Sequence, residues 1–306
     1  MRYRIERLER AGFSAPVREH HFECRIVPWD DGGQRLHGVE IATEPAAELA
    51  SHRDGFGNQV HRGALLGAHD RLVVRLQAEV ETLLANPFDF EAVAPAREAG
   101  WIADSLRQAP RLWDFLLHRS PLTPALEAGA LGEPDDDDAN GDVPSLPLWQ
   151  PGVAILRQMQ DACHQIGEDF TLDRDEAPAA ALTELFLRRS GGAADLAHLL
   201  IAIARSWGVP ARFVTGYLDA GYFEPDADDP GDSEPHPQAL HCWMEALVPG
   251  AGWRGFDPSN DLVADDTFIR LAVGRDLRDV IGFRQSFKGE GRAAELDSEI
   301  DVRRLD

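Results

Sequence analysis

The sequence contains few cysteines, no long apolar run and little positive charge. The three cysteines, Cys24, Cys163 and Cys242, are odd in number and far apart, which argues against a disulfide scaffold. No apolar run approaches the ~20 residues that a membrane helix requires. Charged side chains between Arg2 and Arg7 leave no apolar core for a signal peptide. We therefore expect a cytoplasmic protein that does not bind membranes.

Acidic residues dominate the charge. The chain has 30 basic and 53 acidic side chains in 306 residues, a net charge of -23. Such a charge repels nucleic-acid phosphate and anionic lipid, so neither is expected as a partner. Segments 133–142 and 219–238 hold six and seven acidic residues and no Lys or Arg. Thirteen of the 23 excess negative charges therefore lie in these two insertions. These are either solvated loops that aid solubility or, for the second, a loop that repels anionic substrates near a site.

The pattern of apolar residues changes once along the chain. From Leu72 to Val80 apolar residues alternate with period two, and turn signals such as Asp31-Gly32-Gly33 separate the early segments. This predicts a β-sandwich-like domain over residues 1–86. The pattern after Pro87 is typical of helices, which we expect at 101–106, 112–118 and 153–166.

The clearest helix covers residues 193–207. Its leucines recur at three- and four-residue spacing, and Gly208 followed by Pro210 ends it. Strands are expected after it at 212–218, 240–248, 253–257, 268–273 and 294–302. The sequence therefore predicts an α+β protein with an N-terminal β domain (1–86), a core (87–265) and a C-terminal β tail (266–306).

Four short motifs lie between residues 191 and 258. Gly-Gly-Ala-Ala-Asp-Leu-Ala-His begins at Gly191, and Gly-Val-Pro-Ala-Arg begins at Gly208. His-Cys-Trp-Met-Glu follows at His241, and Gly-Trp-Arg-Gly-Phe-Asp-Pro at Gly252. Together they resemble the transglutaminase-like superfamily, whose bacterial pattern is Gly-x-Cys-x-Asp-x-Ala-His, Gly-(Ile/Val)-Pro-Ala-Arg, His-x-Trp-x-Glu and Gly-Trp-x-x-Phe-Asp-Pro. The N-terminal region, with Phe-Gly-Asn at 56–58, is similar to the domain that precedes the core in one bacterial branch.

The resemblance implies a papain-like core, in which a helix packs on an antiparallel sheet, and a cysteine–histidine–aspartate triad. His241 would be the base and Asp257 the carboxylate that orients it. The nucleophile position is occupied by Ala193, whose methyl group cannot attack a carbonyl. Trp243, Tyr217 and Gly192 are candidates for the substrate cleft, although Trp243 and Tyr217 are equally compatible with core packing.

Ala193 has two explanations. It is either an engineered replacement of cysteine or a natural feature of a pseudoenzyme that serves as a binding or scaffold protein. Retention of His241 and Asp257 favours the first, because a site without a nucleophile has no chemical need of them. The resemblance then implies a cysteine peptidase or amidase that acts on a peptide or isopeptide amide. An amide-forming acyltransferase is a further alternative, and an ATP-grasp-type enzyme is a possible partner.

Other reactive residues have simpler interpretations. No Cys, His or carboxylate pair has zinc-type spacing and no Gly-rich loop cradles phosphate, so we expect no metal and no cofactor. Cys242 should point away from His241, and Cys163 should be a buried thiol. Asp195 should cap the helix or pair with Arg212, and His198 should be a hydrogen-bonded core residue.

Overall fold

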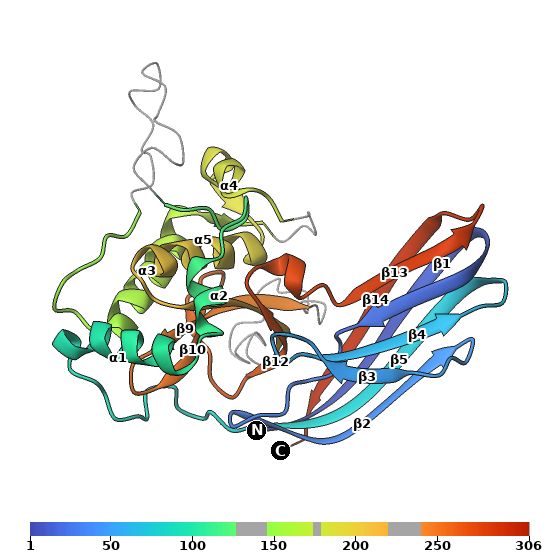
Figure 1. The fold of residues 1–306 in the computed structure, drawn as a ribbon, viewed down its shortest axis with the longest axis horizontal. Helices are drawn as coiled ribbons and strands as arrows, with labels where there is room; N and C mark the ends of the chain where they lie inside the picture. Colours follow the sequence, from blue (N-terminus) through green and yellow to red (C-terminus); the bar gives the residue numbers. More distant parts are fainter. Residues whose placement is uncertain (127–145, 174–178, 220–239, 306) are drawn as a thin grey trace, which may run out of the picture.

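The computed structural model describes residues 1–126, 146–173, 179–219 and 240–305. The predicted acidic segment 133–142 and residues 220–238 of the second lie outside the described residues. A helix-rich core and an elongated β domain lie side by side (Figure 1). The predicted α+β class is therefore confirmed.

A seven-stranded antiparallel sheet forms the β domain, and its central strand β1 covers 23 residues. The order along the main path is β2-β5-β1-β4-β3. The bounds are Arg2–Cys24 for β1, Gln34–Glu44 for β2, Ala50–Arg53 for β3, Gln59–Leu65 for β4 and His69–Thr82 for β5. Side chains of β1 alternate between buried and exposed up to Phe13, and the register shifts between Gly12 and Val17. Both parts of β1 contribute to one core.

The strands after residue 266 pair with both sheets. Strand β12 (Phe268–Gly274) pairs with the core strand β8 (Ala211–Leu218). Strands β13 (Phe283–Gly289) and β14 (Ala293–Arg304) instead pair with β1. Strand β1 has backbone hydrogen-bonding groups along both of its edges. Strands β5 and β4 pair along one edge, and β13 and β14 pair along the other.

The core contains a five-stranded antiparallel sheet in the order β11-β10-β9-β8-β12. Its remaining strands are β9 (His241–Val248), β10 (Gly252–Asp257) and β11 (Leu262–Val263). The α-helices are α1 (Pro95–Gln108), α2 (Leu112–Leu117), α3 (Ile155–Asp169), α4 (Leu182–Arg188) and α5 (Ala193–Ser206). Short strands β6 (Thr171–Leu172) and β7 (Ser190–Gly191) form a parallel pair. None of the helices in the described residues is long and apolar enough to cross a membrane.

Helix α5 lies against β8 and β9, and it is buried along almost its whole length. Leucines at 196, 199 and 200 pack in the same cluster as Phe213 and Met244 of the sheet. The leucine spacing predicted this packing. Of the remaining helices, α2 was predicted to within one residue, α1 at shorter bounds and α3 at shifted bounds, and α4 was not predicted.

Two side-chain amides join the β domain to the free edge of β12. The amide of Asn58 accepts from the backbone N–H of Val273 and donates to its carbonyl, both at 2.8 Å. Gln34 forms the same pair of bonds with Arg270, at 2.9 and 3.0 Å. Each amide bonds both the N–H and the C=O of one β12 residue, as a paired strand would. These bonds fix the position of the β domain relative to β12.

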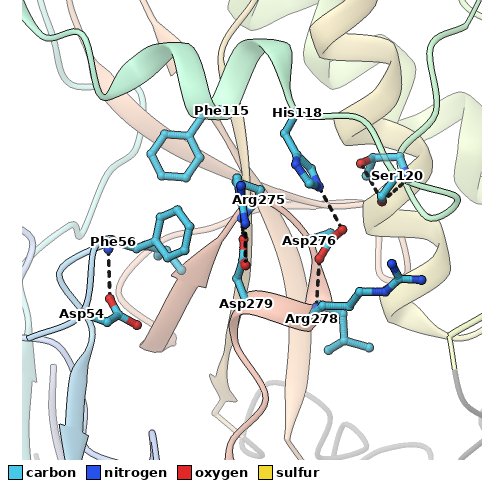
Figure 2. Close-up of polar contacts among 12 residues, drawn as sticks. Asp54, Phe56, Phe115, His118, Ser120, Arg275, Asp276, Arg278 and Asp279 are labelled. Carbon is cyan, nitrogen blue, oxygen red and sulfur yellow. Dashed lines mark hydrogen bonds and ion pairs between the residues drawn. The ribbon is translucent and has the colours of Figure 1, made fainter.

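A second contact joins the turn after β3 to the core (Figure 2). The Phe56 ring lies 5.9 Å from that of Phe115, and the Arg275 guanidinium lies 5.4 Å from the Phe56 centroid. Asp279 holds this guanidinium at 2.8 Å. An aromatic and a fixed cation therefore stack at the domain boundary.

Candidate active site

Helix α5 begins at Ala193, with Gly192 as its N-cap residue. Asp195 accepts the backbone N–H of Gly192 at 3.1 Å through one carboxylate oxygen and that of Ala180 at 2.8 Å through the other. The predicted capping role of Asp195 is confirmed. The predicted pairing with Arg212 is wrong, because Arg212 donates instead to Glu245 at 2.7 Å.

His241 and Asp257 form a close hydrogen-bonded pair. The Nε2 atom of His241 lies 2.7 Å from Oδ2 of Asp257. The Asp257 side chain is fully buried, whereas 17% of the His241 side chain is exposed. Ser259 and Asn260 donate three further hydrogen bonds to the carboxylate, at 2.5 to 3.0 Å.

These contacts fix the charge of Asp257 and the imidazole nitrogen that faces it. Burial opposes ionisation of Asp257, but the hydrogen bonds from His241, Asn260 and Ser259 outweigh it and hold the pKa of Asp257 below its usual value. Because an ionised carboxylate only accepts, Nε2 of His241 carries the proton and donates it. The Nδ1 atom then keeps its lone pair and can act as a base.

Ala193 stands at the start of α5 and His241 at the start of β9. Helix α5 packs on β9, and Cys242 contacts the cluster that contains α5. Burial first, and then the negative charges of Asp257 and Asp195, raise the pKa of the Cys242 thiol to about 12.

Trp243 and Tyr217 have different surroundings. The Trp243 ring is buried and stacks near His241, with 6.2 Å between centroids and 24° between planes. Tyr217 is also buried, but it packs in the core of the β domain and its hydroxyl accepts from Arg7 at 3.0 Å. Of its two interpretations, the structure favours a packed tyrosine with a satisfied hydroxyl.

Two sequence profiles match the chain. The profile of the bacterial transglutaminase-like N-terminal region matches residues 3–81, and that of the transglutaminase-like superfamily matches residues 152–258. The chain belongs to the transglutaminase-like superfamily.

Relatives of this transglutaminase-like chain extend over nearly its whole length. The uncharacterized protein ML0607 of Mycobacterium leprae is 25% identical over 96% of this chain and 95% of its own. The uncharacterized protein Rv2569c of Mycobacterium tuberculosis is 25% identical over 98% of this chain and 92% of its own. A crystal structure of a candidate cysteine protease from Cytophaga hutchinsonii covers 100% of this chain and 92% of its own, at 18% identity and a TM-score of 0.67. That structure shares the fold.

The cysteines of this transglutaminase-like chain are poorly suited to replace a nucleophile. Cys163 and Cys24 are buried, and burial raises the pKa of both thiols. Cys242 is half-buried and follows His241 on β9, where alternation directs the two side chains to opposite faces. Since the thiolate is the reactive form, a raised pKa disfavours each of these thiols as a nucleophile.

Sequence reasoning missed the residues that hold Asp257. Ser259 and Asn260 follow it in a turn, and short polar residues after an Asp-Pro step are typical of such turns. His198 is fully buried and its Nε2 accepts from the backbone N–H of Leu277 at 3.1 Å, which confirms the core role predicted for it. Within the described residues no group of three or more His, Cys, Asp or Glu side chains could hold a metal ion.

Proposed function

We propose that this site is built for cysteine-type chemistry on a peptide or isopeptide amide, and that the chain with Ala193 binds its substrate without cleaving it. The observation that carries the proposal is the His241–Asp257 pair, in which a buried carboxylate leaves Nδ1 of the imidazole free. An activated thiol needs such a base, and the resemblance places the thiol at residue 193.

A cysteine at position 193 would react as follows. The helix dipole at the start of α5 lowers the pKa of the thiol, and Nδ1 of His241 takes its proton. The thiolate attacks the amide carbonyl, and backbone N–H groups including that of residue 193 stabilise the oxyanion. His241 then protonates the departing amine, so the C–N bond breaks and a thioester forms.

The second half of the reaction decides between hydrolysis and transfer. Water activated by His241 would release a carboxylic acid and restore the thiol, whereas an amine would give a new amide. We favour hydrolysis and a cysteine peptidase or amidase. An ATP-grasp-type partner enzyme stays a prediction.

The test restores the thiol. Ala193→Cys should react at neutral pH with a chloroacetamide probe that mimics an amide substrate, and His241→Ala in the same background should slow labelling of residue 193 by at least tenfold. Ala194→Cys is the matched control, because its thiol lies one residue along the same helix without the proposed base. Mass spectrometry identifies the labelled residue.

Equal labelling of the two cysteine variants, independent of His241, would contradict the proposal and favour a scaffold protein. Product analysis with an added amine separates hydrolysis from transfer. The origin of Ala193 is a separate question: an alanine codon in the native gene would rule out engineering.

A further inference from the structure

A cavity of about 430 Å³ lies between the β domain and the core sheet. Asp31, Gln34 and Thr82 line it from the β domain. The core contributes Trp243 and Glu245 of β9, together with neighbouring residues of β8, β10 and β12. The size falls in the range of small-molecule sites.

The cavity is on the side of the core sheet away from α5. Trp243 and Glu245 line it, whereas the alternate residues Met244 and Ala246 pack in the cluster that contains α5. Neither His241 nor Asp257 belongs to its lining. The cavity therefore adjoins the candidate active site through Trp243 without including the imidazole or its carboxylate.

A network of ion pairs fixes the position of two guanidinium groups in the lining. Glu245 accepts from Arg212 at 2.7 Å and from Arg270 at 3.0 Å, and Arg270 also pairs with Asp31 at 2.6 Å. The Arg212 guanidinium lies 4.3 Å from the centroid of Trp253. Because these cations are held by both charge and stacking, their geometry is set before any ligand arrives.

Several donors in the lining lack an acceptor. The indole N–H of Trp243, a residue only 1% exposed, and the Nε–H of Arg270 are buried without a hydrogen-bond partner among the described residues. Arg254 donates to the backbone carbonyls of Pro87, Ala251 and Trp253, and no described carboxylate pairs with it. The N–H groups of Trp243 and Arg270 are closed off from the cavity, so Arg254 is the cation of the lining that an anionic group would pair with.

We propose that this cavity binds a small carboxylate of about the size of an N-acylated amino acid. The guanidinium of Arg254 would receive the carboxylate, and Trp253 with Phe268 would cover the apolar part. The proposal goes beyond the amide chemistry proposed above and does not depend on Ala193.

The position of the cavity suggests a consequence for the active site. The Trp243 and Phe268 rings line the cavity, and their centroids lie 6.2 and 6.4 Å from that of His241. A ligand that presses on these two rings would contact the residues that support the imidazole. A bound carboxylate is therefore placed to influence the orientation of His241.

Titration of the parent chain tests the proposal. The probes are N-acetylphenylalanine and its uncharged amide, and the readouts are intrinsic tryptophan fluorescence and isothermal titration calorimetry. We expect saturable binding of the acid, with the amide at least tenfold weaker. Equal binding of the two, or no saturable binding of either, would overturn the proposal without any variant being needed.

A pair of variants then locates the site. Arg254→Gln should weaken binding of the acid at least tenfold, whereas Arg157→Gln, which removes an exposed arginine on α3, should leave it unchanged. Circular dichroism checks that Arg254→Gln is folded. Binding that Arg254→Gln leaves unchanged in a folded protein would place the acid elsewhere. Since these experiments use the chain with Ala193, their failure is distinguishable from failure of the labelling experiment.

Discussion

Asp257 determines what His241 can do. Its two oxygens accept four hydrogen bonds, three from Ser259 and Asn260 and one from the imidazole. An imidazole held in this way presents the same nitrogen continuously, which an unsupported surface histidine does not.

The amide variant at 257 tests this role. In the Ala193→Cys background, Asp257→Asn should lower the rate of labelling by roughly a thousandfold, because an asparagine NH₂ can donate to Nε2 and so favour the wrong tautomer. The measurement is the second-order rate of alkylation. Ser259→Ala, which removes only one of the hydrogen bonds to Asp257, should have a much smaller effect; a similar loss in both variants would mean that the turn, and not the tautomer, matters.

His20 gives a residue-scale prediction about pH. It is fully buried among Phe13, Phe22 and Phe287, with its Nδ1 atom 3.0 Å from Nε2 of His69. Burial, followed by the nearby His69, lowers the pKa of His20 to about 4. Between pH 6.5 and 4 the unfolded chain therefore binds more protons, and stability falls as the pH falls.

The variant His20→Phe removes this contribution. We expect the dependence of the unfolding free energy on pH to become shallower by up to about 1.4 kcal/mol per pH unit in that window. Urea denaturation at pH 7, 6 and 5 measures it. An unchanged slope would show that His20 is not the group that titrates.

At the scale of elements, Arg205 in the last turn of α5 holds three neighbouring segments. Its guanidinium donates to the carbonyls of Phe115, His118, Ala211 and Arg275 at 2.7 to 3.1 Å. Burial, and then the positive charge of Arg119, lower the pKa of this arginine to about 9. The side chain thus fixes α2, β8 and the segment after β12 to one end of the helix.

Removal of the guanidinium leaves buried carbonyls without donors. Arg205→Met should reduce the unfolding free energy by more than about 3 kcal/mol, since each unsatisfied acceptor costs about 1–3 kcal/mol. Arg188→Met on α4, an exposed position with a single ion pair, is the control and should change stability little. Chemical denaturation monitored by circular dichroism compares the two, and equal losses would contradict the assignment.

Sequence patterns predicted the elements in which the apolar period repeats several times. The leucines of α5 and the alternation in β5 each extend over several repeats, so a single period fits them. Helix α4 has seven residues, and β13 has only two apolar side chains, Phe283 and Phe287, four residues apart. Such short segments contain too little repetition to reveal a period.

The candidate residues His241 and Asp257 were predicted from the family resemblance and not from the sequence pattern itself. His241 and Asp257 are sixteen residues apart, and nothing in their spacing shows that β9 and β10 bring them together. Tyr217 lies on a strand of the core sheet but packs in the core of the β domain, and alternation alone could not show which domain covers it. The cavity escaped prediction because its lining comes from both domains.

At the scale of the whole molecule, Asn58 connects the two domains. Its amide is fully buried, pairs with Val273 and also accepts from the Trp29 indole at 3.0 Å. Asn58→Ala should reduce the unfolding free energy by about 2–3 kcal/mol, because the backbone groups of Val273 lose their partners. Urea unfolding measures this loss. Asn86→Ala, at an exposed turn, should be close to neutral, and a neutral result at both positions would show that the domain contact contributes little.

The pairing of the long strand β1 has a consequence for the synthesis of the protein. Tyr3 pairs with Arg304 and Cys24 with Phe283, so β1 leaves the ribosome long before the strands β13 and β14 that pair with it. At about 5–20 residues per second, that interval lasts some tens of seconds. During this time one side of β1 is open to other nascent chains, and we expect newly made protein to depend on chaperones more than its modest length suggests.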